Sequence, residues 1–404
     1  MSVSLLSELE ACPRRWALGS AEYPDIWEKR GYPRRLHAAA AAGSVVHSVI
    51  ELITNALVRA GCNSVRDPDA IKTMRAIGGY NSAFKICIDR YLDRYECNPR
   101  SRELQGRTRN LLISQIPEMR VRVQTFLGRS QFEASSSTGR EFSSPDSPSS
   151  GRFPIPFGTH TEVRFRAETI GWTGFADRIT LSGDRCEITD VKTGSPNEEH
   201  AFQLRVYALL WSLDSGLNPS GRLASHLTLA YQSRNKAVAV PGHTELAKLE
   251  SELVGRTEST RTAAELSPPP AKPGVETCHY CAVRHLCDDY WTPETQTLLG
   301  TTGEDDTRVD IEALILGRHG RTSWDARIIQ ARSLPHSRQL LVRTASEEIE
   351  LQPGESVRIL DGHLVPETEL GGPAVLTLNA GSEIFRVPTK QQPDQSTESD
   401  CLSS

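Results

Sequence analysis

Two short stretches near the middle of the chain alternate apolar and polar residues, and a turn separates them. They are IGWTGFADRITL (170–181) and CEITDVK (186–192), joined by Ser182-Gly183-Asp184-Arg185. Period-two alternation on both sides of a Gly/Asp turn predicts an antiparallel β-hairpin. In such a hairpin Asp177 and Asp190 lie side by side, and Lys192 faces the same side as Asp190.

This pair of carboxylates favours a divalent cation. Two carboxylates in contact repel each other unless a cation lies between them, and their hard oxygens suit Mg²⁺ or Mn²⁺. A lysine beside such a cation can hold and polarise a water molecule that attacks phosphorus. A solvated surface hairpin is the alternative for an isolated Asp-x-Lys, so the rest of the chain has to decide.

Composition limits the possible classes of protein. A chain of 404 residues with 38% hydrophobic and 24% charged residues predicts two or three globular domains. The net charge of -5 gives no overall basic field, so a nucleic-acid surface would have to be local. We expect no membrane span, because apolar runs of 18 residues are absent, and a cytoplasmic location, because acidic residues occupy the place of a signal peptide's apolar core.

The remaining elements up to about residue 266 predict an α/β core decorated by N-terminal helices. Expected helices cover 2–16 (ending near Pro13), part of 33–61, 70–97, 103–128, 198–214 and 243–266. Expected strands cover 159–168, the hairpin and a pair within 226–240. The Ser/Pro/Gly-rich segment 129–152 is expected to be a flexible insertion.

Residues 305–388 have a different pattern, which predicts a small all-β barrel. Five short alternating segments occur at 309–317, 324–333, 339–351, 355–365 and 374–387. An OB-like barrel fits best and an SH3-like barrel is nearly as compatible. Single-stranded DNA is one expected ligand of a basic groove bearing Trp324 and Phe385, and a docked protein is the alternative. The arginines that motivate this are Arg318, Arg321, Arg327, Arg332, Arg338 and Arg343. A disordered polar tail is expected at 389–404.

The spacing Cys278-x2-Cys281-x5-Cys287 follows the stiff segment SPPPAKPG and indicates metal binding. Nine cysteines in a chain this long do not form a secreted disulfide framework. Three thiolates are one ligand short for zinc or for an iron–sulfur cluster. The fourth ligand would be His279, His285 or the distant Cys12, which lies in the sequence CPRRW.

Together these motifs resemble the RecB-like iron–sulfur branch of the PD-(D/E)xK nuclease superfamily, over roughly residues 1–290. The chain is similar to CRISPR-associated RecB-type exonucleases and to the AddB nuclease domain. The matching motifs, in chain order, are Cys12-Pro-x-x-Trp, Gly43-Ser-Val-Val-His47, Gly174-Phe-Ala-Asp177, Asp190-Val-Lys192, Gln203-Leu-Arg-Val-Tyr207 and the three C-terminal cysteines.

The resemblance implies a restriction-endonuclease-like core in residues 1–290, a mixed sheet flanked by helices. It implies a 4Fe–4S cluster bound by Cys12, Cys278, Cys281 and Cys287. It also implies Mg²⁺ or Mn²⁺ bound by His47, Asp177, Asp190 and the carbonyl of Val191, with Lys192, Gln203 and Tyr207 completing the catalytic group. Glu51 and Glu162 are further acidic candidates, and Arg14, Arg15 and Arg107 are candidate phosphate contacts.

The expected function is that of a metal-dependent DNA nuclease, a single-strand-preferring exonuclease in repair, recombination or defense. DNA is the expected partner, with a helicase or another repair or defense protein. The alternative is a catalytically silent iron–sulfur DNA-binding subunit of a helicase–nuclease complex. A serine acyl-enzyme based on Ser233-x-x-Lys236 and Lys192-Thr-Gly194 is disfavoured because the order of these motifs is reversed. The chain lacks the G-x-x-x-x-G-K-[ST] phosphate loop of a helicase.

Overall fold

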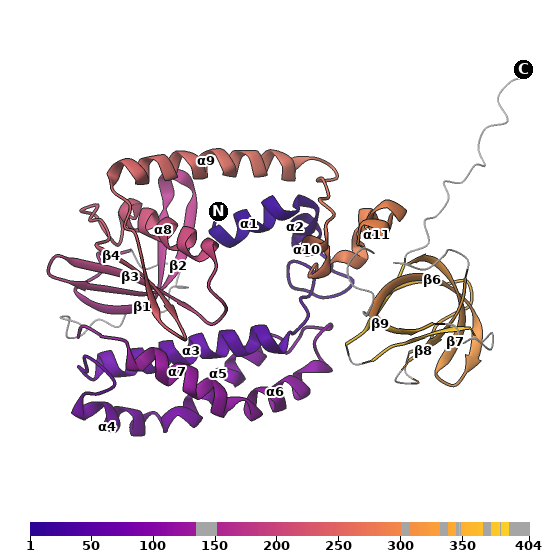
Figure 1. The fold of residues 1–404 in the computed structure, drawn as a ribbon, viewed down its shortest axis with the longest axis horizontal. Coiled ribbons are helices and arrows are strands. Elements are labelled where there is room, and N and C mark those ends of the chain that lie inside the picture. Colours follow the sequence, from indigo (N-terminus) through magenta and orange to yellow (C-terminus); the bar gives the residue numbers. More distant parts are fainter. Residues whose placement is uncertain are drawn as a thin grey trace, which may run out of the picture. The chain divides into compact units, whose positions relative to one another are not determined.

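The computed structural model describes residues 1–134, 152–299, 308–331, 338–344, 347, 349–366, 373–379 and 381–387 (Figure 1). The chain forms two compact units. The first contains residues 1–10 and 22–267, and the second contains residues 11–21 and 268–404. The cysteine-rich segment 278–287, which the sequence places with the nuclease motifs, therefore belongs to the same unit as the C-terminal strands.

The first unit is built on a five-stranded mixed sheet, as expected for an α/β core. Its strands, in spatial and sequence order, are β1 (Gly158–Ala167), β2 (Trp172–Ser182), β3 (Arg185–Lys192), β4 (His226–Tyr231) and β5 (Asn235–Val238). Only β3 and β4 pair in parallel. Helix α8 (Glu198–Leu213) connects these two strands, as a parallel connection requires. This architecture is consistent with a restriction-endonuclease-like fold.

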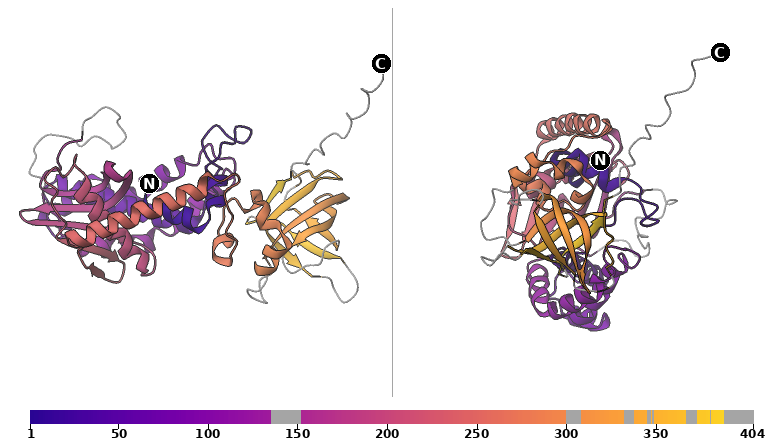
Figure 2. Two further views of the ribbon diagram at one scale, coloured as in Figure 1. Left: turned by 90° about the horizontal axis from the view of Figure 1, so that it is seen from above. Right: turned by 90° about the vertical axis from the view of Figure 1, so that its right-hand side faces the viewer.

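Helices cover both faces of this sheet (Figures 1 and 2). Helix α8 packs on one face, where Phe165, Trp172 and Trp211 lie in one buried cluster, and α9 (His243–Glu265) packs outside α8. On the other face, Val191 and Ala230 contact Phe126 of α7 (Ile116–Gly128) and Ile50 of α3 (Ala38–Arg59). The alternation of side chains along β3 therefore sends Asp190 toward α8 and Val191 toward α3 and α7.

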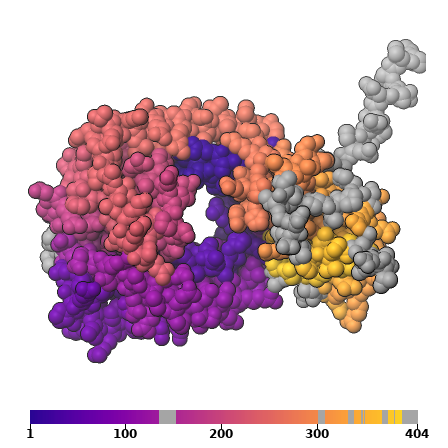
Figure 3. Space-filling view, viewed as in Figure 1, coloured from indigo at the N-terminus to yellow at the C-terminus, as the bar shows by residue number. Residues whose placement is uncertain are grey.

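The N-terminal helices form a separate layer with its own core around α3 (Figure 3). Two helices were expected over 70–97 and 103–128, and the structure has four. They are α4 (Pro68–Ala76), α5 (Gly79–Asp93), α6 (Leu104–Ser114) and α7. Gly78 and Gly79 have φ values of 77° and 73°, which end one helix before the next begins. Pro117 occupies the first turn of α7, where its missing N–H costs nothing.

Helix α3 is, among the described helices, the one long and apolar enough to cross a membrane by length and composition. In the structure its apolar face is part of the core of the helical layer. Val45, Val49, Ile53 and Leu57 are fully buried there, against residues of α5 and α7. This packing accounts for the period of apolar residues in the sequence.

The expected flexible insertion is shorter at its start than the sequence indicated. Phe132 is 3% exposed, and its backbone N–H donates to the Asn63 carbonyl at 2.8 Å. Arg152, at the other end, is half-buried and forms an ion pair with the buried Asp214. Residues 135–151 lie outside the described residues. Since a buried aromatic side chain is well packed, we assign residues 129–134 to the folded core.

In the second unit the segment around Cys12 lies beside the C-terminal cysteines. As expected at Pro13, the N-terminal helix breaks into α1 (Val3–Ala11) and α2 (Pro13–Ser20). Arg14 donates a backbone hydrogen bond to the Pro270 carbonyl at 3.2 Å and a side-chain bond to the Pro269 carbonyl at 2.6 Å. These bonds join two segments more than 250 residues apart in the sequence. The short helices α10 (Val275–His279) and α11 (Pro293–Leu299) belong to the same unit.

The C-terminal strands form the expected barrel. The strands are β6 (Arg308–Gly320), β7 (Ser323–Ala331), β8 (Gln339–Arg343), β9 (Ser356–Val365), β10 (Ala374–Thr377) and β11 (Glu383–Arg386). The first five pair in the closed order β6-β7-β8-β10-β9-β6, with β8 and β10 parallel, and β11 pairs with β9. The last predicted segment, 374–387, is thus two strands rather than one.

The expected aromatic groove on the barrel is wrong for the residues that the structure describes. Trp324 is 1% exposed within the barrel core, and Phe385 stacks on His285 with ring centroids 3.6 Å apart. Trp324 is therefore closed to stacking on a nucleic-acid base, and His285 already covers one face of the half-buried Phe385 ring. Of the arginines, Arg318 lies over the Trp324 ring and Arg321 pairs with Glu347, while Arg332 lies outside the described residues.

A buried polar network joins the cysteine segment to the barrel within the second unit. Arg284, between Cys281 and Cys287, donates to Asp310 at 2.6 Å and to Asp361 at 3.1 Å. Tyr290 donates to the same Asp310 carboxylate at 2.7 Å. Burial opposes the charge of Arg284, but the two carboxylates more than offset it and raise its pKa. The cysteine segment and the barrel are consequently one folded body, since breaking this network would leave charges buried and unpaired.

Candidate active site

The two carboxylates of the hairpin lie where β2 and β3 separate. The β2–β3 ladder ends at the pair Arg178 and Thr189, and Asp177 and Asp190 are the next residues beyond it. Beyond the last pair, a side chain replaces the backbone acceptor: Oδ2 of Asp177 accepts a hydrogen bond from the Val191 N–H at 2.5 Å. The sequence predicted that these carboxylates are neighbours, and the end of the ladder leaves room between them.

Lys192 links the hairpin to α8 through a chain of polar contacts. Its Nζ lies 2.8 Å from Oδ2 of Asp190 and donates to Oε1 of Gln203 at 2.7 Å. Nε2 of Gln203 donates in turn to the hydroxyl of Tyr207 at 2.6 Å. Tyr207 therefore fixes which end of the Gln203 amide faces Lys192.

Gly174 permits this arrangement. A Cβ atom at that position would lie 2.8 Å from Cε1 of Tyr207 and 2.9 Å from Cδ1 of Leu210, closer than packed carbon atoms come. A larger residue at 174 would push α8 away from β2, and with it the Gln203–Lys192 contact.

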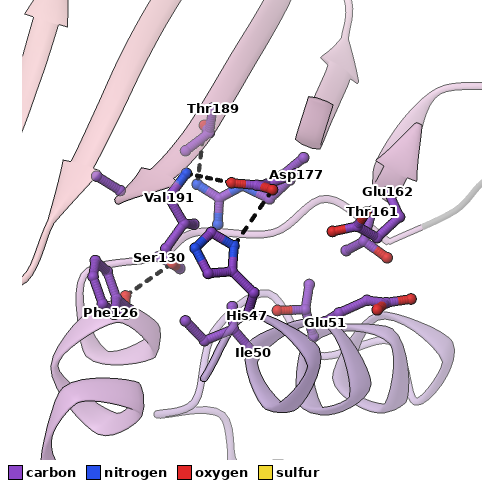
Figure 4. A pocket seen from close by; sticks show the side chains of 13 residues that line it. His47, Ile50, Glu51, Phe126, Ser130, Thr161, Glu162, Asp177, Thr189 and Val191 are labelled. Carbon is purple, nitrogen blue, oxygen red and sulfur yellow. Dashed lines mark hydrogen bonds and ion pairs between the residues drawn. The ribbon is translucent and has the colours of Figure 1, made fainter. Parts of the chain in front are cut away.

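His47 projects from α3 toward Asp177 (Figure 4). Its Nδ1 lies 3.5 Å from Oδ1 of Asp177. Burial lowers the pKa of His47, but the hydrogen bond and negative charge of Asp177 more than offset it, and the net pKa is raised. The imidazole thus lies in an acidic pocket that favours a positive charge, whether a proton or a metal ion.

Two further glutamates line the same pocket. Glu51 follows His47 by one turn of α3, and Glu162 of β1 lies across the pocket from it (Figure 4). Glu162 has φ 49°, and the β1–β2 ladder skips it together with the opposite residue, Asp177, while the register stays the same on both sides. An L residue adopts positive φ only at a cost, and this conformation changes the direction of its side chain. The backbone strain at Glu162 therefore directs an extra carboxylate toward Asp177.

The pocket suits a small cation and its water. It encloses about 30 Å³ and is lined by His47, Glu51, Glu162 and Asp177 among others, which is enough for one or two water-sized species. Burial and then the charge of Asp177 raise the pKa of Asp190 to about 6. Burial and then Asp177 and Glu51 raise that of Glu162 to about 7. Carboxylates held together against their repulsion are arranged for a positive charge.

The fit to a divalent cation rests on one atom in particular. Asp190 is 3% exposed, and its Oδ2 contacts the Lys192 ammonium at 2.8 Å. A buried carboxylate oxygen bound to one ammonium group keeps lone pairs that suit a hard cation. Within the described ranges, however, no three His, Cys, Asp or Glu side chains already surround a metal position. The residues fit such a cation if side chains rotate to close around it.

The raised pKa of Glu162 predicts a pH-dependent gain in stability for Glu162→Gln without metal. The pKa of this group is higher in the folded than in the unfolded protein, so its ionisation lowers stability as pH rises from about 4.5 to about 7. Glutamine removes that loss. We expect the Tm in EDTA to exceed the wild-type Tm by a few degrees at pH 8 and to match it near pH 5. An equal difference at both pH values would contradict the role of ionisation.

The four cysteines of the proposed cluster come together in the second unit. Cys12 caps α2, its Sγ accepting from the Arg15 N–H at 3.4 Å, and its charge acts on the other three thiols. Burial raises the pKa of Cys278 and Cys281, and that of Cys287 to about 11. Cys12 and Cys281 are buried and Cys278 and Cys287 are half-buried, all as free thiols. Four thiols that interact electrostatically are suited to a soft metal, which binds them as thiolates.

The local candidates for the fourth ligand have other contacts. His279 packs edge-on against Tyr280 with ring centroids 4.6 Å apart, and His285 stacks on Phe385. Arg14 bonds to proline carbonyls and pairs with Asp289 at 3.1 Å, so the structure gives it a role in packing rather than a free surface position. The charge of Arg15 acts on Cys278 and Cys281. Arg107 is exposed on α6 and does not line the pocket.

Sequence reasoning missed Arg178 and Arg94. Arg178 follows Asp177 directly and lines the pocket, and burial lowers its pKa against the opposing charges of Glu187 and Asp177. Arg94, at the end of α5, lines an outer extension of the pocket. The only sequence signal for Arg178 was a charged residue at a buried position of a strand. Arg94 had none, because its proximity to the site depends on how α5 packs against α3.

Comparison with known proteins identifies one family. A family model described as the PD-(D/E)XK nuclease superfamily matches residues 1–288. No curated protein matches the chain. Matching solved structures include "Crystal structure of SSO0001", 22% identical, with 32% of this chain and 59% of that chain covered and a TM-score of 0.21. They also include fission yeast Pot1 with single-stranded DNA, at 12% identity, 31% and 49% coverage and a TM-score of 0.18. Similarity this low carries no argument about fold or ligand.

Proposed function

The chain belongs to the PD-(D/E)XK nuclease superfamily, and from this premise we propose that it is a Mg²⁺- or Mn²⁺-dependent DNA nuclease. The observation that carries the proposal is the group of side chains around Asp177. Nδ1 of His47 lies 3.5 Å from Asp177 in the pocket, Asp190 follows the last β2–β3 pair as Asp177 does, and Lys192 lies 2.8 Å from Asp190. Hydrolysis of a phosphodiester needs both a cation and an oriented water molecule.

The proposed cation ligands are Asp177, Asp190, His47 and the carbonyl oxygen of Val191. When bound, a divalent cation lowers the pKa of a water molecule and neutralises charge on phosphate oxygens. The raised pKa of Asp190 means that the carboxylate must lose its proton to serve as a ligand, so cation affinity is expected to fall as pH decreases below about 6.

Lys192 orients the attacking water or stabilises the charge that develops on the phosphate. Its ammonium group carries three protons, and Asp190 and Gln203 engage two directions of it. The third direction is left for substrate or water. Tyr207 holds the Gln203 amide in place. Burial first, and then the charge of Asp190, raise the pKa of Tyr207, so its hydroxyl stays protonated and remains bonded to Gln203.

The finer assignments are proposals that rest on the resemblance. We place the chain in the RecB-like iron–sulfur branch, with a 4Fe–4S cluster on Cys12, Cys278, Cys281 and Cys287, as a single-strand-preferring exonuclease of repair, recombination or defense in the cytoplasm. A helicase or another repair or defense protein would supply its substrate. The order of strand pairing, with β8 and β10 parallel, supports an OB-like rather than an SH3-like barrel.

The alternative, a catalytically silent DNA-binding subunit, is disfavoured by the polar contacts of the site. A subunit that had lost catalysis would not need Gln203 and Tyr207 to hold the ammonium of Lys192. Buried polar chains are costly unless every member is satisfied, so a scaffold role alone gives no reason to keep this one.

The proposal is tested by incubating purified full-length protein with labelled DNA in Mg²⁺, in Mn²⁺ and in EDTA. We expect cleavage in both metals and none in EDTA, because a divalent cation both activates water and neutralises phosphate charge, and the side chains of the pocket cannot do both. Linear single strands should be cut faster than duplexes, and circular single strands should resist an exonuclease. Cleavage in EDTA, or no cleavage of any substrate in either metal, would contradict the proposed function.

A further inference from the structure

An outer groove of about 540 Å³ extends from the carboxylate pocket, and the proposed function does not yet use it. The two hollows share His47, Glu51, Glu162 and Asp177. The rest of the groove is lined by small or hydroxyl-bearing residues and one arginine. They are Ala39, Ala40, Gly43, Ser44, Ser48, Thr193 and Arg94. The volume is within the range of small-ligand sites, about 300–1,000 Å³, so the groove holds far more than a cation and its water.

One face of α3 forms the floor of this groove. Ala40, Ser44, His47 and Glu51 recur at intervals of three and four residues, so they lie in a row that leads to the carboxylates. Because the first members of the row have short side chains, a ligand backbone can approach the helix closely. The hydroxyls of Ser48 and Thr193 offer donors to an anionic oxygen along the way, whereas that of Ser44 bonds to Tyr91.

Arg94 is the one arginine or lysine in the described lining of this groove. It is exposed at the C-terminal end of α5, and among the described residues it forms no ion pair. The positive charges of Arg90 and Arg94 both favour the ionised form of Glu51, so loss of Arg94 would leave Arg90 to stabilise that carboxylate. An arginine held in a groove with three acidic residues, and without an ion pair of its own, is free to bind an anion that enters the groove.

We propose that the outer groove binds the backbone of one DNA strand and that Arg94 binds a phosphate adjacent to the one that is cut. This inference rests on the proposed nuclease function. The carboxylates of the pocket repel every phosphate of the strand that comes near them. The cation offsets this repulsion for the phosphate that is cut, but not for the neighbouring phosphates. A guanidinium group offers two parallel donors to a phosphate and offsets that repulsion one position along the strand. Arg94 is thus a positioning residue.

The test compares Arg94→Gln with Arg75→Gln, which removes an exposed arginine of α4 that does not line the groove. Affinity for a labelled single-stranded oligonucleotide is measured in EDTA over a range of salt, and steady-state kinetics are measured in Mg²⁺. For Arg94→Gln we expect an approximately five- to tenfold higher Kd and KM, and a salt slope reduced by about 0.7, the value for one phosphate contact on a single strand. The kcat should stay within about twofold, and Arg94→Lys should recover part of the affinity.

A second variant, Ala40→Phe, places a large ring in the groove at an exposed helix position, away from the carboxylates. We expect it also to raise KM without lowering kcat. If the wild-type protein binds and cuts DNA but Arg94→Gln behaves like Arg75→Gln, this inference is wrong and the nuclease function stands. If Arg94→Gln lowers kcat with an unchanged Kd, Arg94 is not a positioning residue. If the wild-type protein neither binds nor cuts DNA, the proposed function itself is wrong.

Discussion

Replacing Lys192 with alanine should lower the rate of metal-dependent DNA cleavage about a thousandfold while the protein stays folded. The ammonium group lies between Asp190 and Gln203, where it can orient water and stabilise charge on the phosphate. Removal of one such preorganised group typically costs two to three powers of ten in kcat. Single-turnover cleavage of a labelled single strand in Mg²⁺ measures the loss, and circular dichroism and Tm measure folding.

Two matched variants make this experiment specific. Lys236→Ala removes an exposed lysine of β5 in the same sheet and should retain full activity. Asp190→Asn should lose activity for a different reason, because it removes a cation ligand. Mg²⁺ should raise the Tm of Lys192→Ala as it raises that of the wild type, but should have little effect on Asp190→Asn. Cleavage by purified Lys192→Ala protein at the wild-type rate would show that the assignment of the active site is wrong.

Replacing Cys281 with serine should remove the proposed cluster and destabilise the second unit. Wild-type protein purified without oxygen is expected to be brown, with absorption near ~400 nm as thiolate-bound iron clusters show. Cys281 is 7% exposed and senses the charges of both Cys278 and Cys12. Loss of a ligand from a site that joins residues 11–21 to residues 268–299 should allow the two segments to separate.

Cys97→Ser serves as the control, because Cys97 is exposed and lies in the first unit. This variant should retain wild-type colour, iron and sulfide content, and Tm. A colourless wild-type protein with about one zinc per chain would instead favour the structural zinc site that the cysteine spacing also permits. Unchanged iron content in Cys281→Ser would exclude this cysteine as a ligand.

Much of the site could be predicted from local pattern, because its members lie on regular elements. Period-two alternation on both sides of a Gly/Asp turn put Asp177 beside Asp190 and Lys192 on the face of Asp190, and the structure has Nζ of Lys192 2.8 Å from Asp190. Likewise, the four-residue spacing of Gln203 and Tyr207 put both on one side of a helix, where they are hydrogen-bonded.

Other features could not be read from local pattern. The break between α4 and α5 depends on two glycines with positive φ, and nothing in their sequence distinguishes them from helix-compatible glycines. The positive φ that directs Glu162 lies opposite Asp177 in the pairing of β1 with β2. Trp324 is a core residue rather than a stacking platform, because the barrel closes around it. Each of these outcomes is decided by neighbours distant in the sequence.

The sequence by itself determined the identity of the chemical groups: paired carboxylates, a lysine two residues on, a histidine on an apolar helix and four separated cysteines. Side-chain direction repeats with the period of each element, so these features follow from short-range geometry. Only the tertiary structure decided which groups meet. Packing of α3 against the sheet brings His47 to Asp177, and packing of α5 against α3 brings Arg94 to the groove. Contacts between elements depend on the packing of the whole core, so the spacing of residues within one helix or strand does not predict them.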